Sequence, residues 1–235
     1  MYPLDTFFRA ALWRAAHGRV HTGPFAGLLL APKPFLPHLL GSYEKELHPA
    51  IERLCAMRWR TIVNVGGGNG FYIAGLGRRI PDARLVVFEL TAEARDVIAA
   101  TVARNGLAAR TTILGAAEPA NFEPALAGEQ PVLVVMDVEG AELDLTDPAT
   151  APSLRRATML VETHDVLRAG CRDAIVARYS GTHRITEIAT AARTLADFPA
   201  DLAPSLQKAM RKKCWEAVQE WRGGAQVWLL LEPNG

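Results

Sequence analysis

The glycine-rich segment 66–70 constrains the fold of this chain more than any other stretch. It follows an apolar run of strand-like composition, residues 61–65, and it precedes a helix-like run that Pro81 stops. Glycine permits positive φ and lets a ligand approach bare backbone, while a helix start offers free N–H groups. A strand, a tight turn and a helix N-terminus in this order predict a site for a nucleotide-like ligand.

The spacing of the glycines narrows the class of ligand. Gly66, Gly68 and Gly70 form the pattern G-x-G-x-G, with Gly67 inside it. The dinucleotide fingerprint would need glycine or alanine at the position of Phe71. No Gly-Lys-Ser/Thr follows the glycines, so the sequence excludes a P-loop for nucleoside triphosphates.

Glu89 is the second indication of a nucleotide site. It ends a predicted strand at residues 84–89, and a carboxylate at this tip can accept hydrogen bonds from both ribose hydroxyls of an adenosine. A third predicted strand, residues 110–115, leads into Ala116, whose small side chain leaves room for an adenine ring. The alternative is a plain glycine turn with an unrelated surface glutamate. The glycines after one predicted strand and Glu89 at the tip of the next together favour the ligand site.

Two further apolar runs, residues 131–137 and 157–162, have the composition of parallel strands that are buried on both faces. Acidic residues end both runs. In open α/β sheets the carboxyl ends of the strands form the ligand-binding edge, so we expect the polar residues there to lie together. These residues are Asp137, Glu139, Glu162, His164 and Asp165.

The alternation of strands and helices predicts a doubly wound, Rossmann-like α/β sheet, completed by strands at residues 183–188 and 226–231. Residues 1–40 are expected to be an N-terminal helical extension that prolines interrupt. It could pack on the core, contact a second subunit of a homodimer, or act as a lid. Residues 41–235 are expected to form the main domain.

Residues 64–70, Glu89 and the run Asp137-Val-Glu-Gly-Ala-Glu142 resemble class I S-adenosylmethionine-dependent methyltransferases, and within them the FkbM family of mostly O-methyltransferases. The resemblance spans roughly residues 41–165. It implies a seven-stranded sheet of order 3-2-1-4-5-7-6 with the last strand antiparallel. It also implies S-adenosylmethionine as cofactor and a hydroxyl of a small molecule or sugar as methyl acceptor. One departure is Asn64, where the family usually has an acidic residue.

The resemblance also assigns cofactor-binding candidates by position. The segment around Tyr43 lies near the cofactor in the family, so it supplies secondary candidates. The cofactor candidates are Asn64, Gly66, Gly67, Gly68, Gly70, Glu89, Ala116 and Asp137, with Tyr43 and Glu44 as the secondary pair.

Catalysis of methyl transfer to oxygen requires a position for the acceptor and an outlet for its proton, and two arrangements are open. His164 could act as the general base, because its unperturbed pKa of about 6.5 suits neutral pH. Alternatively, Asp137 with Glu162 or Asp165 could hold Mg²⁺, which would acidify a bound hydroxyl. Asp137 is therefore a candidate for catalysis, for metal binding and for cofactor binding.

Composition limits the partners and the compartment. The net charge is +1, from 26 basic and 25 acidic residues, which gives no field to attract nucleic acid or a membrane surface. Three scattered cysteines without metal spacing, and no apolar run long enough for a membrane span or signal peptide, predict a cytoplasmic protein. Two other functions remain open: an NAD(P)-dependent oxidoreductase, and a non-catalytic binding module with a cofactor fold.

Overall fold

The structure is a computed structural model that describes residues 3–224 and 226–234. The chain divides into two compact units. The sheet unit contains residues 53–190 and 223–235, and the helical unit contains residues 1–52 and 191–222. The segment 1–40, expected as an extension, therefore shares a unit with residues 41–52 and with a second segment close to the C-terminus.

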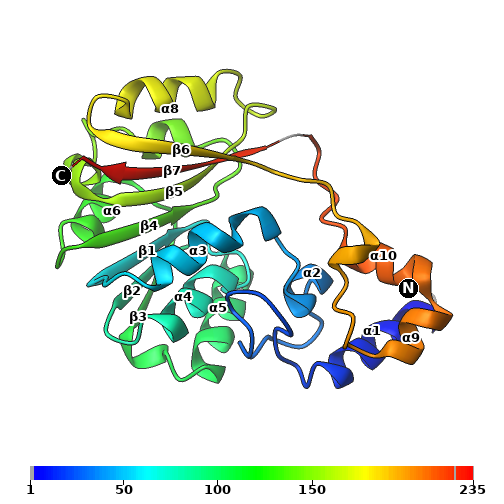
Figure 1. The fold of residues 1–235 in the computed structure, drawn as a ribbon. Coiled ribbons are helices and arrows are strands. Elements are labelled where there is room, and N and C mark those ends of the chain that lie inside the picture. Colours follow the sequence, from blue (N-terminus) through cyan, green and yellow to red (C-terminus); the bar gives the residue numbers. More distant parts are fainter. Residues whose placement is uncertain (1–2, 225, 235) are drawn as a thin grey trace. The chain divides into compact units, whose positions relative to one another are not determined.

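The sheet unit is built on a single seven-stranded sheet of order β3-β2-β1-β4-β5-β7-β6 (Figure 1). Strands β1 to β5 pair in parallel, whereas β7 runs antiparallel to both β5 and β6. This confirms the predicted fold and strand order. The strands are β1 Thr61–Val65, β2 Arg84–Phe88, β3 Thr111–Leu114, β4 Val132–Met136, β5 Thr158–Thr163, β6 His183–Ala189 and β7 Val227–Pro233.

Helices cover both faces of this sheet. On one face, Phe122 of α6 and Ile175 of α8 join a buried cluster with Val63 of β1 and Val134 of β4. Helices α4 and α5 pack on the first three strands of the sheet (Figure 1). The helices of this unit are α4 Phe71–Arg79, α5 Ala92–Arg104, α6 Pro119–Leu126, α7 Glu142–Leu145 and α8 Cys171–Tyr179, with 3₁₀ turns η2 Ala108–Arg110 and η3 Pro152–Arg156.

The central strands β1, β4 and β5 are mostly apolar because helices cover both faces of the sheet, and their few polar residues include Asn64 of β1 and Glu162 of β5. Every residue of β1, β4 and β5 is buried. In register, Val65 pairs with Phe88 of β2 and with Met136 of β4, so the three strands end side by side. Whatever follows these strands in the sequence is therefore brought to one edge of the sheet.

Local signals set the helix boundaries, and one prediction needs correction. The Thr91 hydroxyl caps α5 by accepting a hydrogen bond from the N–H of Ala94 at 3.3 Å, as the sequence predicts. The amphipathic pattern of residues 166–179 predicts a helix over this whole range, but the helix begins only at Cys171. The N–H groups of Leu167 and Arg168 both donate to the carbonyl of His164 in a turn, and Gly170 has φ +76°. That left-handed residue separates the turn from the helix.

The helical unit consists of short helices joined by irregular segments. Apolar residues recur at helical spacing from Leu202 to Trp221 and predict a single helix there. The structure breaks this segment at Met210, which has the non-helical angles φ −132° and ψ 44°. Ser42 precedes a run of helical spacing with acids in its first turn, a pattern that predicts a helix cap. In the structure its hydroxyl is buried with no hydrogen-bond partner in the described part of the chain, and the helix begins at His48. The elements are α1 Pro3–Ala15, α2 Leu36–Leu40, η1 Lys45–Leu47, η4 Leu195–Asp197, α9 Pro204–Ala209 and α10 Arg211–Val218, with α3 His48–Cys55 spanning the boundary between the units.

A chain of buried ion pairs lies inside the helical unit, and we call it the arginine–glutamate network. Arg193 pairs with Glu46 and, at 2.7 Å, with Glu220. Arg222 pairs with Glu220 at 2.8 Å and with Glu44 at 2.6 Å. Acidic and basic groups thus alternate along the network, and each carboxylate contacts at least one guanidinium group. This satisfies charges that burial would otherwise destabilise.

No helix in residues 3–224 and 226–234 is long and apolar enough to cross a membrane. Among the residues that the structure describes, the cysteines Cys55, Cys171 and Cys214 form no disulfide bond. The cytoplasmic location stays a prediction.

Candidate functional site

The turn between β1 and α4 forms the first part of the candidate site. Gly66 has φ +79°, and its N–H donates to the carbonyl of Phe88 at 3.0 Å. A Cβ on this residue would lie 1.6 Å from the carbonyl oxygen of Asp137. Only glycine fits here, and the turn therefore packs directly against the backbone that follows β4.

Gly68 lies within the same turn and is required for a different reason. Its φ of +53° is in the left-handed region, but a Cβ there would meet no atom within 4 Å. The N–H of Gly68 donates to Oε2 of Glu89 at 2.9 Å, and the N–H of Thr91 donates to Oε1 at 3.0 Å. The structure thus joins two predicted cofactor residues and leaves open space beside the turn.

The remaining small residues of the prediction have structural partners. A Cβ on Gly67 would lie 2.5 Å from Cγ2 of Val87, so this glycine lets the turn lie against β2. Gly70, with φ +82°, is the N-cap residue of α4. Ala116 follows β3 and is half-buried, and its carbonyl accepts a hydrogen bond from Nδ2 of Asn121 at 2.9 Å. Their roles toward a cofactor stay predictions.

Asn64, the departure from the family pattern, is buried near the carboxyl end of strand β1. Its Nδ2 donates to the carbonyls of Val135 at 3.3 Å and Gly66 at 3.5 Å. The Oδ1 atom is also buried and has no hydrogen-bond partner among the described residues. The amide links the ends of β1 and β4, a link that an aspartate, which would place a carboxylate against two carbonyl oxygens, could not make.

Tyr43 and Glu44, the secondary candidates, belong to the helical unit and to its arginine–glutamate network. The Glu44 carboxylate accepts from Arg222 at 2.6 Å, and the Glu44 N–H donates to Oε1 of Glu220 at 2.9 Å. The guanidinium carbon of Arg222 lies 5.9 Å from the ring centroid of Tyr43, a cation–π distance. These contacts give both side chains a structural role within the unit, and their roles toward a cofactor stay predictions.

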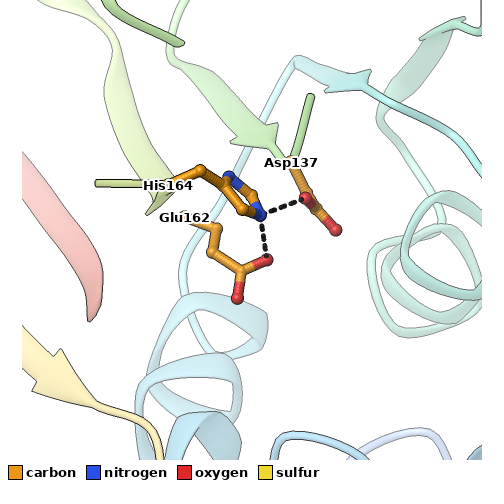
Figure 2. Close-up of side chains that lie close together, drawn as sticks. All are labelled: Asp137, Glu162 and His164. Atoms are coloured by element: carbon orange, nitrogen blue, oxygen red, sulfur yellow. Dashed lines mark ion pairs between the residues drawn. The ribbon is translucent and has the colours of Figure 1, made fainter. Parts of the chain in front are cut away.

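The second part of the site is a group of ionisable side chains at the ends of β4 and β5, which we call the acid–histidine cluster. It consists of Asp137, Glu139, Glu142, Glu162 and His164. Figure 2 shows Asp137 and Glu162 converging on the ring of His164. The Nε2 atom of His164 lies 3.7 Å from Asp137 Oδ1, 3.6 Å from Glu162 Oε2 and 3.6 Å from Glu139 Oε2. The sheet therefore brings together four of the residues that the sequence assigned to this edge.

Glu142 completes the cluster, although the sequence interpretation gave it no role at the site. It opens α7 and is fully buried, and its Oε1 lies 2.5 Å from Nδ1 of His164. The N–H of Gly140 also donates to this oxygen at 3.1 Å. Glu139 and Gly140 both have positive φ, and this tight turn after β4 returns Glu142 to the sheet. Glu142 is the third acid of the Asp-Val-Glu-Gly-Ala-Glu run, and this was the signal available in the sequence.

The surroundings shift the ionisation of these groups. Burial by itself lowers the pKa of His164, but the hydrogen bond to Glu142 and the charges of Glu142, Glu162 and Asp137 raise it to about 9. Burial and the charge of Glu162 raise the pKa of Asp137 to about 8. A protonated imidazole cannot accept a proton, so this environment counts against His164 as a general base at neutral pH.

Asp137, Glu162 and His164 each offer one ligand atom, and these atoms lie within 4.8 Å of one another. In the described part of the chain this is the group that could share a metal ion. Asp165, the third metal candidate from the sequence, is not in it. Its side chain is exposed, and its carboxylate accepts from the N–H of Arg172 at 3.4 Å. Along an extended chain, residues 162 and 164 point to one side and residue 165 to the other.

Comparison with solved structures identifies the fold. The chain is similar to a putative O-methyltransferase from Klebsiella pneumoniae, with a TM-score of 0.50, 14% identity, and coverage of 99% of this chain and 91% of the other. It is also similar to cofactor-bound Rv0187 from MTB, with a TM-score of 0.50, 18% identity, and coverage of 98% and 97%. A third similar structure is the METTL16 MTase domain, with a TM-score of 0.53, 14% identity, and coverage of 96% and 78%.

The fold is that of the class I methyltransferases. At these identities the likeness concerns the fold alone. No protein-family model matches the sequence, and no curated protein matches it. Membership of the FkbM family stays a prediction.

Proposed function

We propose that this chain is an S-adenosylmethionine-dependent methyltransferase that acts on a hydroxyl of a small-molecule acceptor. One observation carries the proposal: the Glu89 carboxylate lies against the N–H of Gly68 at 2.9 Å, at the carboxyl edge of β1 and β2. In a sheet of this order the ligand-binding crevice lies at that edge. The names of two similar structures, an O-methyltransferase and a methyltransferase domain, support the same reaction class.

The residues at the turn fit an adenosine ligand. Glu89 receives hydrogen bonds from Gly68 and Thr91 but has no ion pair among residues 3–224 and 226–234, so its negative charge is available to ribose hydroxyls. The space that a Cβ on Gly68 would occupy is open. When bound, S-adenosylmethionine supplies a methyl group that its sulfonium makes electrophilic.

The chain itself would position the acceptor. Of the three converging residues, only Asp137 has appreciable exposure, with 27% of its side chain accessible against 3% for Glu162 and for His164. An acceptor arriving from solvent can therefore touch Asp137, and the buried pair behind it would hold that carboxylate in place. Holding the hydroxyl in line with the methyl group is the main contribution that such a site makes to the rate.

The topology argues against the oxidoreductase alternative. A sheet of the dinucleotide-binding type has six parallel strands, whereas β7 here is antiparallel and inserted between β5 and β6. A non-catalytic binding module remains the second candidate, because Asn64 replaces the acid that the resemblance leads us to expect.

A ligand panel tests the proposal. We expect S-adenosylmethionine and S-adenosylhomocysteine to raise the melting temperature and to titrate in calorimetry, while NAD and NADP do neither. Gly68→Val should abolish this binding, because its side chain would fill the open space, and Gly106→Val is a matched control in another open turn with positive φ. Stabilisation by NAD instead would overturn the assignment.

A second step separates the enzyme from the binding module. A panel of sugar, phenol and carboxylic acid hydroxyls is incubated with labelled S-adenosylmethionine, and transfer of label to any acceptor supports the enzyme. Binding without transfer across the panel would favour the module.

A further inference from the structure

The acid–histidine cluster places its carboxylates at different depths, with Glu142 and Glu162 buried, 27% of the Asp137 side chain exposed and 76% of the Glu139 side chain exposed. Four carboxylates surround one imidazole. Neither Asp137, Glu139 nor Glu142 forms a salt bridge with an arginine or lysine among the residues that the structure describes. Even a fully protonated His164 contributes only one positive charge. The carboxylates of Asp137 and Glu162 both lie close to Nε2 of His164, and a cation bound there would offset the repulsion between them.

The orientation of His164 provides an independent indication. The side chain is 3% exposed, and its Nδ1 is held by Glu142 at 2.5 Å. Its Nε2 points toward Asp137 and Glu162 (Figure 2) but makes no hydrogen bond within the described residues, because the nearest oxygens lie 3.6–3.7 Å away. A buried imidazole that is fixed through one nitrogen and directs the other at carboxylates is the usual arrangement of a metal-ligating histidine.

The spacing of the ligand atoms agrees with this. Tetrahedral ligands at about 2.1 Å from a metal ion lie about 3.4 Å from one another. The Nε2 to oxygen distances of 3.7 Å to Asp137 and 3.6 Å to Glu162 are close to that value. They are too long for hydrogen bonds, so they fit an ion between the groups better than direct contact.

We propose that His164 Nε2, Asp137 Oδ1 and Glu162 Oε2 bind a divalent transition-metal cation, with Glu142 as a positioning residue for the imidazole. A ligand set of one imidazole and two carboxylates suits Zn²⁺ or Mn²⁺, whereas Mg²⁺ prefers oxygen ligands alone and keeps most of its waters. The proposed site thus differs from the magnesium site that the sequence predicts, both in the ion and in the replacement of Asp165 by His164. Asp137, the exposed ligand, would face the remaining coordination position.

Metal binding is measured on the full chain, freed of metal by chelator and titrated with Zn²⁺ alone by calorimetry and with Mn²⁺ alone by electron paramagnetic resonance. We expect one saturable ion per chain. Glu162→Gln and His164→Gln should each weaken binding at least about tenfold. Magnesium chloride in excess should not displace the bound ion.

Two matched controls remove one carboxylate each without touching the proposed ligands. Asp165→Asn changes the exposed neighbour of His164, and Glu129→Gln changes an exposed glutamate elsewhere in the sheet unit. Both should bind metal like the wild type. Weakened binding in Asp165→Asn with unchanged binding in His164→Gln would overturn the proposed ligand set.

Far-UV circular dichroism establishes that each variant is folded. If Glu162→Gln fails to fold, Asp137→Asn takes its place, because the Asp137 side chain is partly exposed and tolerates change better. Absence of saturable binding by folded wild type would leave a cluster held by the imidazolium alone and would overturn the proposal. No methyl donor or acceptor is present in these titrations, so their outcome is independent of the proposed methyltransferase activity.

Discussion

The arginine–glutamate network and the acid–histidine cluster both hold buried carboxylates, but they surround them with different groups. The network lies within the helical unit, and the cluster lies within the sheet unit. In the network, Arg193 and Arg222 alternate with three glutamates, so permanent cations compensate the acids. In the cluster, one histidine faces four carboxylates.

This difference separates structure from function. A buried acid with a resident arginine needs no other partner, and its role ends with the stability of the fold. A buried acid without one raises the question of which ligand supplies the charge. The comparison therefore directs attention to Asp137, whose Oδ1 atom is buried and has no hydrogen-bond partner among the described residues. The role of Glu44 toward a cofactor stays a prediction.

The largest expected effect concerns the network. Arg193→Met removes the cation between Glu46 and Glu220 and leaves both carboxylates buried, which should lower the free energy of unfolding by about 3–5 kcal/mol. Urea denaturation measures it. Arg172→Met is the control, because its pair with Asp173 is exposed and its loss should cost less than about 0.5 kcal/mol. Equal losses in the two variants would break the comparison.

The second effect concerns the cluster and has the opposite sign. In the presence of chelator, Glu162→Gln removes one like charge, so its unfolding free energy should equal or exceed that of the wild type. Zn²⁺ at 100 times its wild-type dissociation constant should stabilise the wild type by about 2.7 kcal/mol and the variant, which binds at least about tenfold more weakly, by about 1.4 kcal/mol or less. Chemical denaturation with chelator and with Zn²⁺ measures the unfolding free energy of both proteins in each condition. A chelated variant less stable than the wild type would mean that the cluster is structural.

Glu89 is a carboxylate in a third kind of environment, because backbone N–H groups and not cations donate to it. Glu89→Gln should weaken the binding of S-adenosylhomocysteine by about 1–3 kcal/mol, since a charged acceptor for the ribose hydroxyls is lost. Calorimetry measures the change, and the exposed Glu93→Gln is the control. Unchanged affinity in Glu89→Gln would mean that this carboxylate only shapes the turn.

The smallest expected effect comes from a buried group that stays uncharged. Burial lowers the pKa of His38 in the helical unit to about 3, against about 6.5 when unfolded. Since the unfolded chain binds the proton first, stability is retained above pH 6.5 and is lost as the pH falls toward 3.

Between pH 7.5 and 5.5 the loss from His38 should be about 1.4 kcal/mol. His38→Gln should remove this part of the slope in urea denaturation, whereas the exposed His17→Asn should keep it. An identical slope in His38→Gln would assign the acid sensitivity to other groups.

Sequence patterns predicted the sheet unit well because its determinants are local. The helix at Phe71–Arg79 begins at the glycine turn and ends before Pro81, and α5 begins after its Thr91 cap. The apolar runs located all seven strands, while their order came from the family resemblance. The same reasoning failed at Met210, where a stripe of helical spacing continues through a residue with non-helical backbone angles.

The candidate site was predictable to the extent that it follows strand ends. Gly68 and Glu89 meet as expected because both leave neighbouring parallel strands. Glu142 could not be assigned, since only the left-handed turn at Glu139 and Gly140 returns it to the sheet. The alternation of side chains along an extended chain places His164, and not Asp165, on the same side as Glu162, and this signal was available in the sequence.

The antiparallel strand β7 has a consequence for how this protein can vary. Residues 191–222 leave the sheet after β6 and return just before β7, yet Ala189 and Val227 are paired neighbours in the hairpin. The ends of the insertion are therefore held together by the sheet whatever the insertion contains, and lengthening such a loop costs little. Natural variation or grafting could therefore exchange residues 191–222 for another segment, because the pairing of β6 with β7 keeps the strand order of the sheet.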